Sequence, residues 1–222
     1  MCGRYTQTAD MKTLQERFRL SAGRAGLEPR YNIAPTQQAP VVVREAERSL
    51  EFFHWGLVPS WAKGPKIGHK MINARAESLL EKPSFRKPLQ RSRCLVPADG
   101  FYEWKKASGW KAKTPVRVVL KGREPFAMAG LWDVWKAPDG TELRSFAIVT
   151  TGANDAMKAV HDRMPAILDP QDEERWLDPE VGAEKAAGLL RPWPGALELY
   201  EVSPLVNSPA NDVPACAEEL VR

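Results

Sequence analysis

The second residue of the chain carries the clearest chemical signal in the sequence. Removal of Met1 leaves Cys2 with an α-amine and a thiol on adjacent carbon atoms. Ordinary pKa values of about 7.7–8.0 for an α-amine and about 8.5 for a thiol give each group a reactive form near neutral pH. Such an aminothiol captures an aldehyde in two steps, because the amine forms a Schiff base and the thiol then closes a thiazolidine ring. Cys2 is therefore predicted to trap an aldehyde, the alternative being a free thiol at a frayed chain end.

A carboxylic acid within a run of aromatic residues is the second candidate. Residues 100–104 have the sequence Gly-Phe-Tyr-Glu-Trp. In a strand, Glu103 shares one face with Phe101, whereas Tyr102 and Trp104 share the other. Burial among rings favours the protonated acid, which predicts a proton-transfer role for Glu103 near neutral pH. A water-facing glutamate on an edge strand is the alternative.

Two polar clusters add further candidates. Asn73, Arg75 and Glu77 combine an amide, a guanidinium and a carboxylate in one short segment, and an arginine can bind a phosphate through two hydrogen bonds. The alternative for Asn73 is the cap of a helix. His161 stands in a loop-like His-Asp-Arg-Met-Pro stretch after the small residues 150–153. It is either an acid–base residue or a histidine that is structural or merely exposed.

Basic residues gather in one part of the chain. Residues 52–98 contain nine lysines and arginines against two acids, whereas the whole chain has a formal net charge of +4. A concentrated positive field suits a polyanion. Trp55, Trp61 and Trp104 lie in or near this segment, and rings among cations suit the stacking of unpaired bases. Trp55 fits a core position better than Trp61 does. Single-stranded nucleic acid is one candidate partner, and an ordinary solvated surface is the other interpretation.

Several classes of protein are excluded by what the sequence lacks. Cys2, Cys94 and Cys216 are odd in number and widely spaced, which excludes a disulfide framework and a cysteine-rich zinc site. No histidine pair has zinc spacing and no glycine-rich loop could cradle a phosphate, so no metal or cofactor is predicted. No apolar run approaches the ~18 residues of a membrane span, and a secretory signal is absent. We expect a cytoplasmic monomer that makes no membrane contact.

Short β-rich segments dominate the elements that must position these residues. The pattern predicts strands at residues 41–43, 50–55, 115–120, 126–132, 146–150 and 197–202. An early helix is expected with Thr8 as its cap and with Met11, Leu14 and Phe18 on one face, and later helices over residues 170–177 and 181–190. Strands do not alternate regularly with helices. This favours one α+β domain over residues 1–222, with a mainly antiparallel sheet or partly closed barrel and flanking helices.

Six short motifs together resemble the SOS-response-associated peptidase (SRAP) family, whose bacterial and animal members shield abasic sites in single-stranded DNA. The motifs are spread over almost the whole chain. In order, they are Met1-Cys2-Gly3-Arg4, Asn32-Ile33-Ala34-Pro35, Trp55 to Pro59, Asn73-Ala74-Arg75, Phe101 to Trp104 and His161 to Pro165. The resemblance implies an SRAP-like domain whose mature chain starts at Cys2 and which needs no cofactor.

The resemblance also implies a mechanism and a set of site residues. Cys2 would form a thiazolidine crosslink with the ring-opened deoxyribose of an abasic site, protecting the site from cleavage and error-prone repair. Asn73 would hold the α-amine or the thiazolidine nitrogen, Glu103 would shuttle a proton during ring closure and reversal, and His161 would assist opening of the sugar. The residues implied to contact DNA are Arg4, Pro35, Trp61, Arg75, Thr150 and Arg163.

Two other functions stay open. The family name indicates a cysteine peptidase, in which Cys2 would attack a peptide bond with help from Glu103 and His161, either in trans or only to remove Met1. A non-enzymatic binder of single-stranded nucleic acid would form no covalent product, so its binding would survive Cys2→Ala. The enzyme that the resemblance favours is a lyase-like crosslinking protein that also removes its own Met1.

Overall fold

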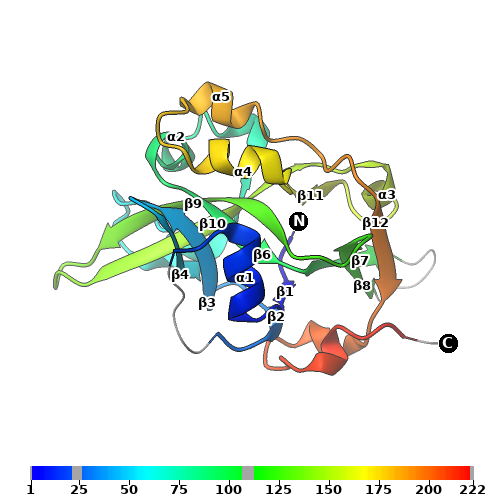
Figure 1. Cartoon of the computed structure of the whole chain (residues 1–222). Helices are drawn as coiled ribbons and strands as arrows, with labels where there is room; N and C mark the ends of the chain where they lie inside the picture. The colour runs from blue at the N-terminus through cyan, green and yellow to red at the C-terminus, as the bar shows by residue number, and fades with distance from the viewer. Residues whose placement is uncertain (1, 22–26, 107–112, 221–222) are drawn as a thin grey trace.

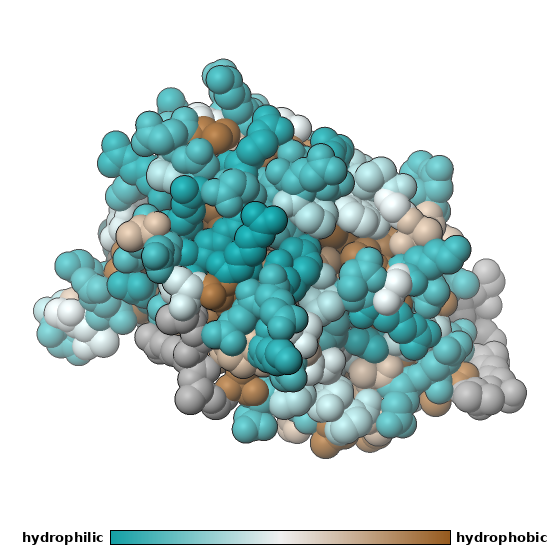
Figure 2. All heavy atoms as spheres, viewed as in Figure 1, coloured by the Kyte–Doolittle hydropathy of each residue, from teal (hydrophilic) through white to brown (hydrophobic). Residues whose placement is uncertain are grey.

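The strands of the protein form two sheets, of seven and five strands, with helices around them (Figure 1). The computed structural model describes residues 2–21, 27–106 and 113–220. Over these residues, no helix is both long enough and apolar enough to cross a lipid bilayer. Figure 2 shows one face of the molecule, which is largely hydrophilic and on which hydrophobic residues appear in small, separate patches.

Five strands of the larger sheet close into a barrel. Around the ring, the order is β10 (Glu142–Gly152), β4 (Arg48–Trp55), β3 (Gln38–Arg44), β6 (Arg93–Ala98) and β9 (Phe126–Lys136), and β9 pairs back with β10. β10 and β4 run parallel, whereas the other neighbours in the ring are antiparallel. Two short strands also pair with β10, namely β5 (Asn73–Arg75) in parallel and β11 (Arg163–Pro165) antiparallel. The expected mainly antiparallel, partly closed barrel is confirmed.

The second sheet places the first residues of the chain beside the strand that carries Glu103. Its order is β12 (Leu197–Glu201), β8 (Lys113–Leu120), β7 (Gly100–Lys106), β1 (Tyr5–Gln7) and β2 (Arg30–Ile33), with every pair antiparallel. Tyr5 pairs with Phe101, and the Tyr102 N–H donates to the carbonyl of Arg4 at 3.0 Å. The chain before Arg4 therefore runs alongside Glu103.

The helices pack against the barrel strands. α2 (Pro83–Arg91), α4 (Pro170–Leu177) and α5 (Ala183–Ala187) lie together at the top of Figure 1, where α2 contacts α5 and α4 contacts β6. α1 (Met11–Phe18) lies in front of the barrel and α3 (Asp155–Lys158) at the far end of β10. Short 3-10 helices occupy the connections at Pro65–Lys70, Ala76–Ser78, Pro204–Asn207 and Pro214–Cys216.

Both faces of the barrel strands are buried. Along β10, Phe146 and Ile148 join a core cluster shared with the five-stranded sheet, whereas Ala147 and Val149 join a cluster shared with α1, α2, α4 and α5. This alternation is the period-two pattern of a strand. Because both faces are covered, residues 146–149 of β10 are apolar at every position.

The predicted strands and later helices are confirmed by β3, β4, β8, β9, β10 and β12 and by α4 and α5, although α5 is shorter than expected. The predicted cap of the first helix is wrong. Asp10 caps α1, because its carboxylate accepts the Thr13 N–H at 2.8 Å. The Thr8 hydroxyl instead donates to Asp99 at 2.7 Å. The capping alternative for Asn73 is also wrong, since Asn73 lies in β5.

Candidate active site

Cys2 is buried in the interior and is held there by Asn73. Its side chain belongs to the core cluster between the barrel and the five-stranded sheet. The Asn73 side-chain N–H donates to the Cys2 carbonyl at 2.9 Å. The other polar atom of this amide, Asn73 Oδ1, is buried and has no hydrogen-bond partner within the described part of the chain. Asn73 therefore offers an acceptor close to the backbone of Cys2.

Glu103 acts electrostatically on the Cys2 thiol from the neighbouring strand. Its side chain is buried on β7, which removes the alternative of a glutamate facing water. Phe101 and Tyr102 belong to different core clusters, as the predicted alternation of faces requires. Burial, and after it the negative charge of Glu103, raises the pKa of the Cys2 thiol above its ordinary value. The thiol is therefore protonated near neutral pH and lies close to a carboxylate that can exchange a proton with it.

Three adjacent strands bring four of the predicted residues together. In the register of β5, β10 and β11, Arg75 pairs with Thr150 and Gly152 pairs with Arg163. The Arg163 guanidinium donates to the Thr150 carbonyl at 2.6 Å. It also forms a two-pronged ion pair with Glu77, at 2.6 and 3.0 Å. Arg75 is exposed, so this edge of the sheet presents one exposed and one paired guanidinium next to Asn73.

His161 lies between α3 and β11, with a side chain that is 29% exposed. The Arg163 backbone N–H donates to His161 Nδ1 at 2.9 Å. The carboxylate of Asp162 lies equally close to Nδ1, but a neutral nitrogen that accepts one hydrogen bond cannot also donate a second. Asp162 is almost fully exposed, so the backbone bond is the one that fixes the ring. In the neutral tautomer the proton then lies on Nε2.

The comparison with known sequences decides the family. The sequence model of the SOS response associated peptidase (SRAP) family matches residues 1–209. This chain belongs to the SRAP family. Among the relatives of this chain is the abasic site processing protein YoqW of Bacillus subtilis. The two are 44% identical over 223 residues, which cover 98% of this chain and 99% of YoqW. The abasic site processing protein HMCES of Gallus gallus is 36% identical and extends further, since the match covers 85% of this chain and 65% of that protein.

Solved structures agree with this SRAP fold. A crystal structure of a protein from Bacteroides thetaiotaomicron superimposes with a TM-score of 0.89 at 28% identity, covering 99% of this chain and all of the other. The crystal structure of a phage-related protein from Bordetella bronchiseptica gives a TM-score of 0.72 at 32% identity, over 90% and 94% of the two chains.

The remaining residues predicted for the SRAP site, Trp61, Pro35 and Arg4, lie in different settings. Trp61 is 60% exposed, in a loop that the Trp135 indole anchors through the carbonyl of Ala62 at 2.7 Å. Pro35 is half-buried in a turn in which the Gln37 N–H donates to the Ala34 carbonyl at 3.3 Å. The following Thr36 has a φ of 74°, as the third position of a type II turn requires.

Arg4 already has several protein partners. Its guanidinium donates to Asn32 Oδ1 at 2.9 Å and to the carbonyls of Val206 at 2.6 Å and Asn207 at 3.2 Å. Its central carbon lies 5.9 Å from the centre of the Trp104 ring. Burial lowers the pKa of Arg4. The structure thus ties the residue two positions after Cys2 to the C-terminal part of the chain, whereas the sequence suggested only a DNA contact.

Asn32 and Asp212 also attach the first part of the chain to its C-terminal part. The sequence interpretation assigned neither residue a role. The carboxylate of Asp212 accepts the backbone N–H groups of Tyr31 at 2.5 Å and Asn32 at 2.8 Å, and it also pairs with Arg30. The Asn32 side chain donates to three carbonyls between residues 206 and 211. The Asn-Ile-Ala-Pro motif could have singled out Asn32. The sequence around Asp212 has no recognisable pattern that could have identified it as a partner.

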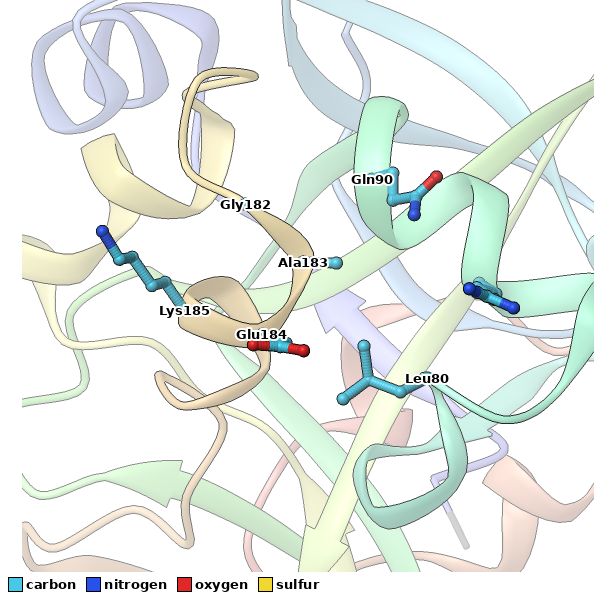
Figure 3. Close-up of a pocket in the computed structure, with 7 residues that line it drawn as sticks. Leu80, Gln90, Gly182, Ala183, Glu184 and Lys185 are labelled. Carbon is cyan, nitrogen blue, oxygen red and sulfur yellow. The ribbon is translucent and has the colours of Figure 1, made fainter.

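A separate hollow between α2 and α5 is not part of this centre. It is lined by Leu80, Gly182, Ala183 and the side chains of α2 that face them, including Gln90 (Figure 3). Lys185 extends away from Leu80 and Gln90 in this view. Over the described ranges, no three histidine, cysteine, aspartate or glutamate side chains are grouped so that they could hold a metal ion.

Proposed function

We propose that this protein processes abasic sites in single-stranded DNA by capturing their aldehyde with the aminothiol of Cys2. The observation that carries the proposal is the placement of Cys2: its carbonyl is held by Asn73, and its thiol is influenced by the buried Glu103. The relatives named abasic site processing proteins support the choice of substrate. The basic and aromatic residues around the centre support a nucleic-acid partner.

The chemistry requires removal of Met1 and releases one water. The α-amine of Cys2 attacks the aldehyde carbon of the ring-opened sugar, and loss of water from the carbinolamine gives a Schiff base. The sulfur then attacks the same carbon, so a C–S bond forms while the C=N bond becomes a single bond. The thiol proton is lost and the ring nitrogen gains one. The product is a five-membered thiazolidine that links the protein to the DNA.

The neighbouring side chains have distinct parts in these steps. Because burial keeps the thiol of Cys2 protonated by raising its pKa, ring closure needs a base, and Glu103 accepts that proton and delivers it to nitrogen. Asn73 Oδ1, which lacks a partner among the described residues, accepts a hydrogen bond from the α-amine or the ring nitrogen. His161, fixed through Nδ1, donates from Nε2 to the sugar oxygen as the sugar opens.

The DNA backbone would cross the edge formed by β5, β10 and β11. Arg75 is exposed there, and Arg163 can exchange Glu77 for a phosphate, since both anions accept a two-pronged bond from a guanidinium. Thr150 and Pro35 would contact the DNA as well, Thr150 from the strand that pairs with Arg75. Trp61, with 60% of its surface exposed, is available to stack on a base. Arg4 adds positive charge, although its donors already bond within the protein.

Intact mass spectrometry tests the proposal directly. We would incubate the protein with a single-stranded oligonucleotide carrying one abasic site. The expected product lacks Met1, contains the oligonucleotide minus one water, and maps to Cys2; Cys2→Ala and a variant that retains Met1 give none. If Met1 is absent and the wild type still forms no adduct, the crosslinking function is wrong.

Self-removal of Met1 is a second candidate activity. The thiol of Cys2, near Glu103, is placed next to the bond that must break to expose the α-amine, and the SRAP family description includes a peptidase. Purification from cells depleted of methionine aminopeptidase activity would test it. Retention of Met1 in that material would contradict self-processing and leave the crosslinking chemistry intact.

A further inference from the structure

Tyr5 carries a buried hydroxyl that takes no part in the steps proposed for Cys2. It belongs to β1, which lies between β2 and β7 in the five-stranded sheet (Figure 1). The side chain is fully buried, and its hydroxyl has no hydrogen-bond partner within residues 2–21, 27–106 and 113–220. An unsatisfied buried hydroxyl destabilises a fold, so a side chain that only filled the core would be more favourable as phenylalanine. The hydroxyl is therefore available to a group that changes during the reaction.

The register of the sheet places Tyr5 on the same face as Glu103. Tyr5 pairs with Phe101, and residues that lie opposite each other on two strands project to one face. Glu103 follows Phe101 by two positions and projects to that face as well. Tyr5 and Phe101 also share a core cluster with Cys2. The phenol, the carboxylate and the thiol therefore occupy the same side of the five-stranded sheet, which is the side turned towards the barrel.

The ring of Tyr5 is held by the segment that also positions Cys2. It packs edge-on against Trp55, with the ring centres 5.2 Å apart and the planes at 66°. The Trp55 indole N–H donates to the Ile72 carbonyl at 2.9 Å. The next residue, Asn73, holds the carbonyl of Cys2. Both Tyr5 and Cys2 are thus attached to the same short stretch of chain, which keeps their relative positions fixed.

The hydroxyl lies within electrostatic reach of the Cys2 sulfur. Burial, and after it the negative charge of a Cys2 thiolate, raises the pKa of Tyr5 well above its ordinary value. The positive charge of Arg30 opposes this shift, and Cys94 on β6 adds to it. Tyr5 consequently keeps its proton near neutral pH. It remains a hydrogen-bond donor while the charge of the sulfur changes.

Loss of the thiol proton changes what the sulfur needs. In the unreacted protein, the Cys2 thiol donates to the Arg4 carbonyl at 3.9 Å. A thiolate has no proton to donate and is repelled by a carbonyl oxygen, so it must turn towards a donor. The Tyr5 hydroxyl is a buried donor on the same face, and a hydroxyl rotates to suit its partner. The two groups therefore become complementary only when the thiol ionises.

We propose that the Tyr5 hydroxyl donates a hydrogen bond to the sulfur of Cys2 during ring closure. The thiol proton passes to Glu103, and the thiolate accepts the hydrogen bond from Tyr5. The sulfur then attacks the Schiff-base carbon, so the C–S bond forms as the C=N bond becomes single. Glu103 gives its proton to the ring nitrogen, whereas Tyr5 keeps its own throughout. The inference rests on the proposed function and adds to it a residue that acts on the sulfur alone.

Borohydride quenching separates the two chemical steps. We would mix the protein with a single-stranded oligonucleotide carrying one abasic site and quench samples with borohydride over time. Borohydride reduces a Schiff base to a secondary amine but leaves a thiazolidine unchanged, so the adducted N-terminal peptides differ in mass by two hydrogen atoms. Tyr5→Phe should form the Schiff base within about twofold of the wild-type rate but close the ring about 10- to 150-fold more slowly, the scale of one hydrogen bond to a charged atom. A reducible adduct should therefore accumulate.

Tyr102→Phe is the matched control. Tyr102 is as deeply buried as Tyr5, but it belongs to another core cluster, and its hydroxyl donates to the Tyr31 carbonyl at 2.7 Å. Removing a hydroxyl that already has a partner should lower the free energy of unfolding and leave ring closure unchanged. Tyr5→Phe should show the opposite pattern, with slow ring closure and no loss of stability in a denaturant titration.

Three results for Tyr5→Phe would overturn the inference and leave the crosslinking function intact. The first is ring closure at the wild-type rate. The second is an equal slowing of both steps, because Tyr5 would then only position Cys2. The third is a clear loss of stability, because the hydroxyl would then have a partner before the reaction starts. A wild type that forms no adduct of either kind would refute the crosslinking function, and the inference with it.

Discussion

The side-chain amide of Asn73 donates to the backbone carbonyl of Cys2 at 2.9 Å, across 71 positions of sequence. This contact fixes the main chain of Cys2 rather than its sulfur. The amide comes from β5, a three-residue strand that depends on pairing with β10. The orientation of Cys2 therefore depends on a strand that could not exist without the barrel.

Asn73→Ala should slow adduct formation at Cys2 by about 10- to 100-fold, because a small misplacement of a reacting group has a large kinetic effect. Mass spectrometry over a time course measures the rate. Affinity for undamaged single-stranded DNA should change little. A variant that reacts at the wild-type rate would show that the contact does not position Cys2.

Glu103→Gln should bind DNA normally and exchange its crosslink slowly, because the amide cannot carry the proton between sulfur and nitrogen. The pH profile gives a second readout. With the pKa of the Cys2 thiol raised by burial, the reactive thiolate becomes more abundant as pH increases. Ring closure in Glu103→Gln should therefore still be accelerating at about pH 8.5, the ordinary thiol value. A profile that is flat above neutrality would contradict this role.

Arg75→Ala should weaken binding to single-stranded DNA of every sequence and lower the salt slope by about 0.7, as the loss of one phosphate contact requires. Binding titrations at several salt concentrations measure the slope. An unchanged slope would remove Arg75 from the phosphate-binding residues.

Glu77→Gln should tighten DNA binding about 2- to 5-fold at low salt, the scale of an exposed ion pair, because it frees Arg163 and removes a negative charge. The pKa of Glu77 is lowered chiefly by its hydrogen bonds from Arg163, so the ion pair survives to a lower pH than the carboxylate of an unpaired glutamate would. Glu81→Gln removes the same charge from an exposed neighbouring position and serves as the control. Equal effects of the two substitutions would show that only net charge matters.

Asp212→Ala should lower the free energy of unfolding by about 2–3 kcal/mol, since a half-buried carboxylate that accepts several hydrogen bonds is lost. Denaturant titration measures this change. Asp155→Ala removes an exposed carboxylate that pairs with Lys158 on the surface and should leave stability unchanged. Equal stability of Asp212→Ala and the wild type would mean that the C-terminal attachment contributes nothing to the fold.

Local sequence pattern was enough to predict β3, β4, β8, β9, β10 and β12, but it missed β6 and the strands of three residues. β3, β8 and β10 are rich in β-branched residues and have glycine or proline in or near them, so they could be recognised alone. β5 and β11 have three residues each and exist because β10 pairs with them. α2 was missed because Pro83 begins it and Pro88 lies within it, and proline usually argues against a helix interior.

The candidate site was predicted by residue type, whereas its contacts depended on the fold. Cys2 and Glu103 could be singled out because an aminothiol and an acid among rings have distinctive chemistry. The pairing of Arg163 with Glu77 joins residues 86 positions apart. The attachment of Arg4 to Val206 joins residues 202 positions apart. No local pattern encodes such contacts, since they arise only when distant segments meet in the fold.

The attachment of Arg4 to Val206 and Asn207 also sets an order of events during synthesis. A ribosome that adds about 5–20 residues per second needs about 10–40 seconds to travel from Arg4 to its carbonyl partners. Throughout that interval the Arg4 guanidinium lacks the carbonyls that later hold it. Enzymes that trim nascent chains therefore have access to Met1 before the start of the chain is attached to its C-terminal part.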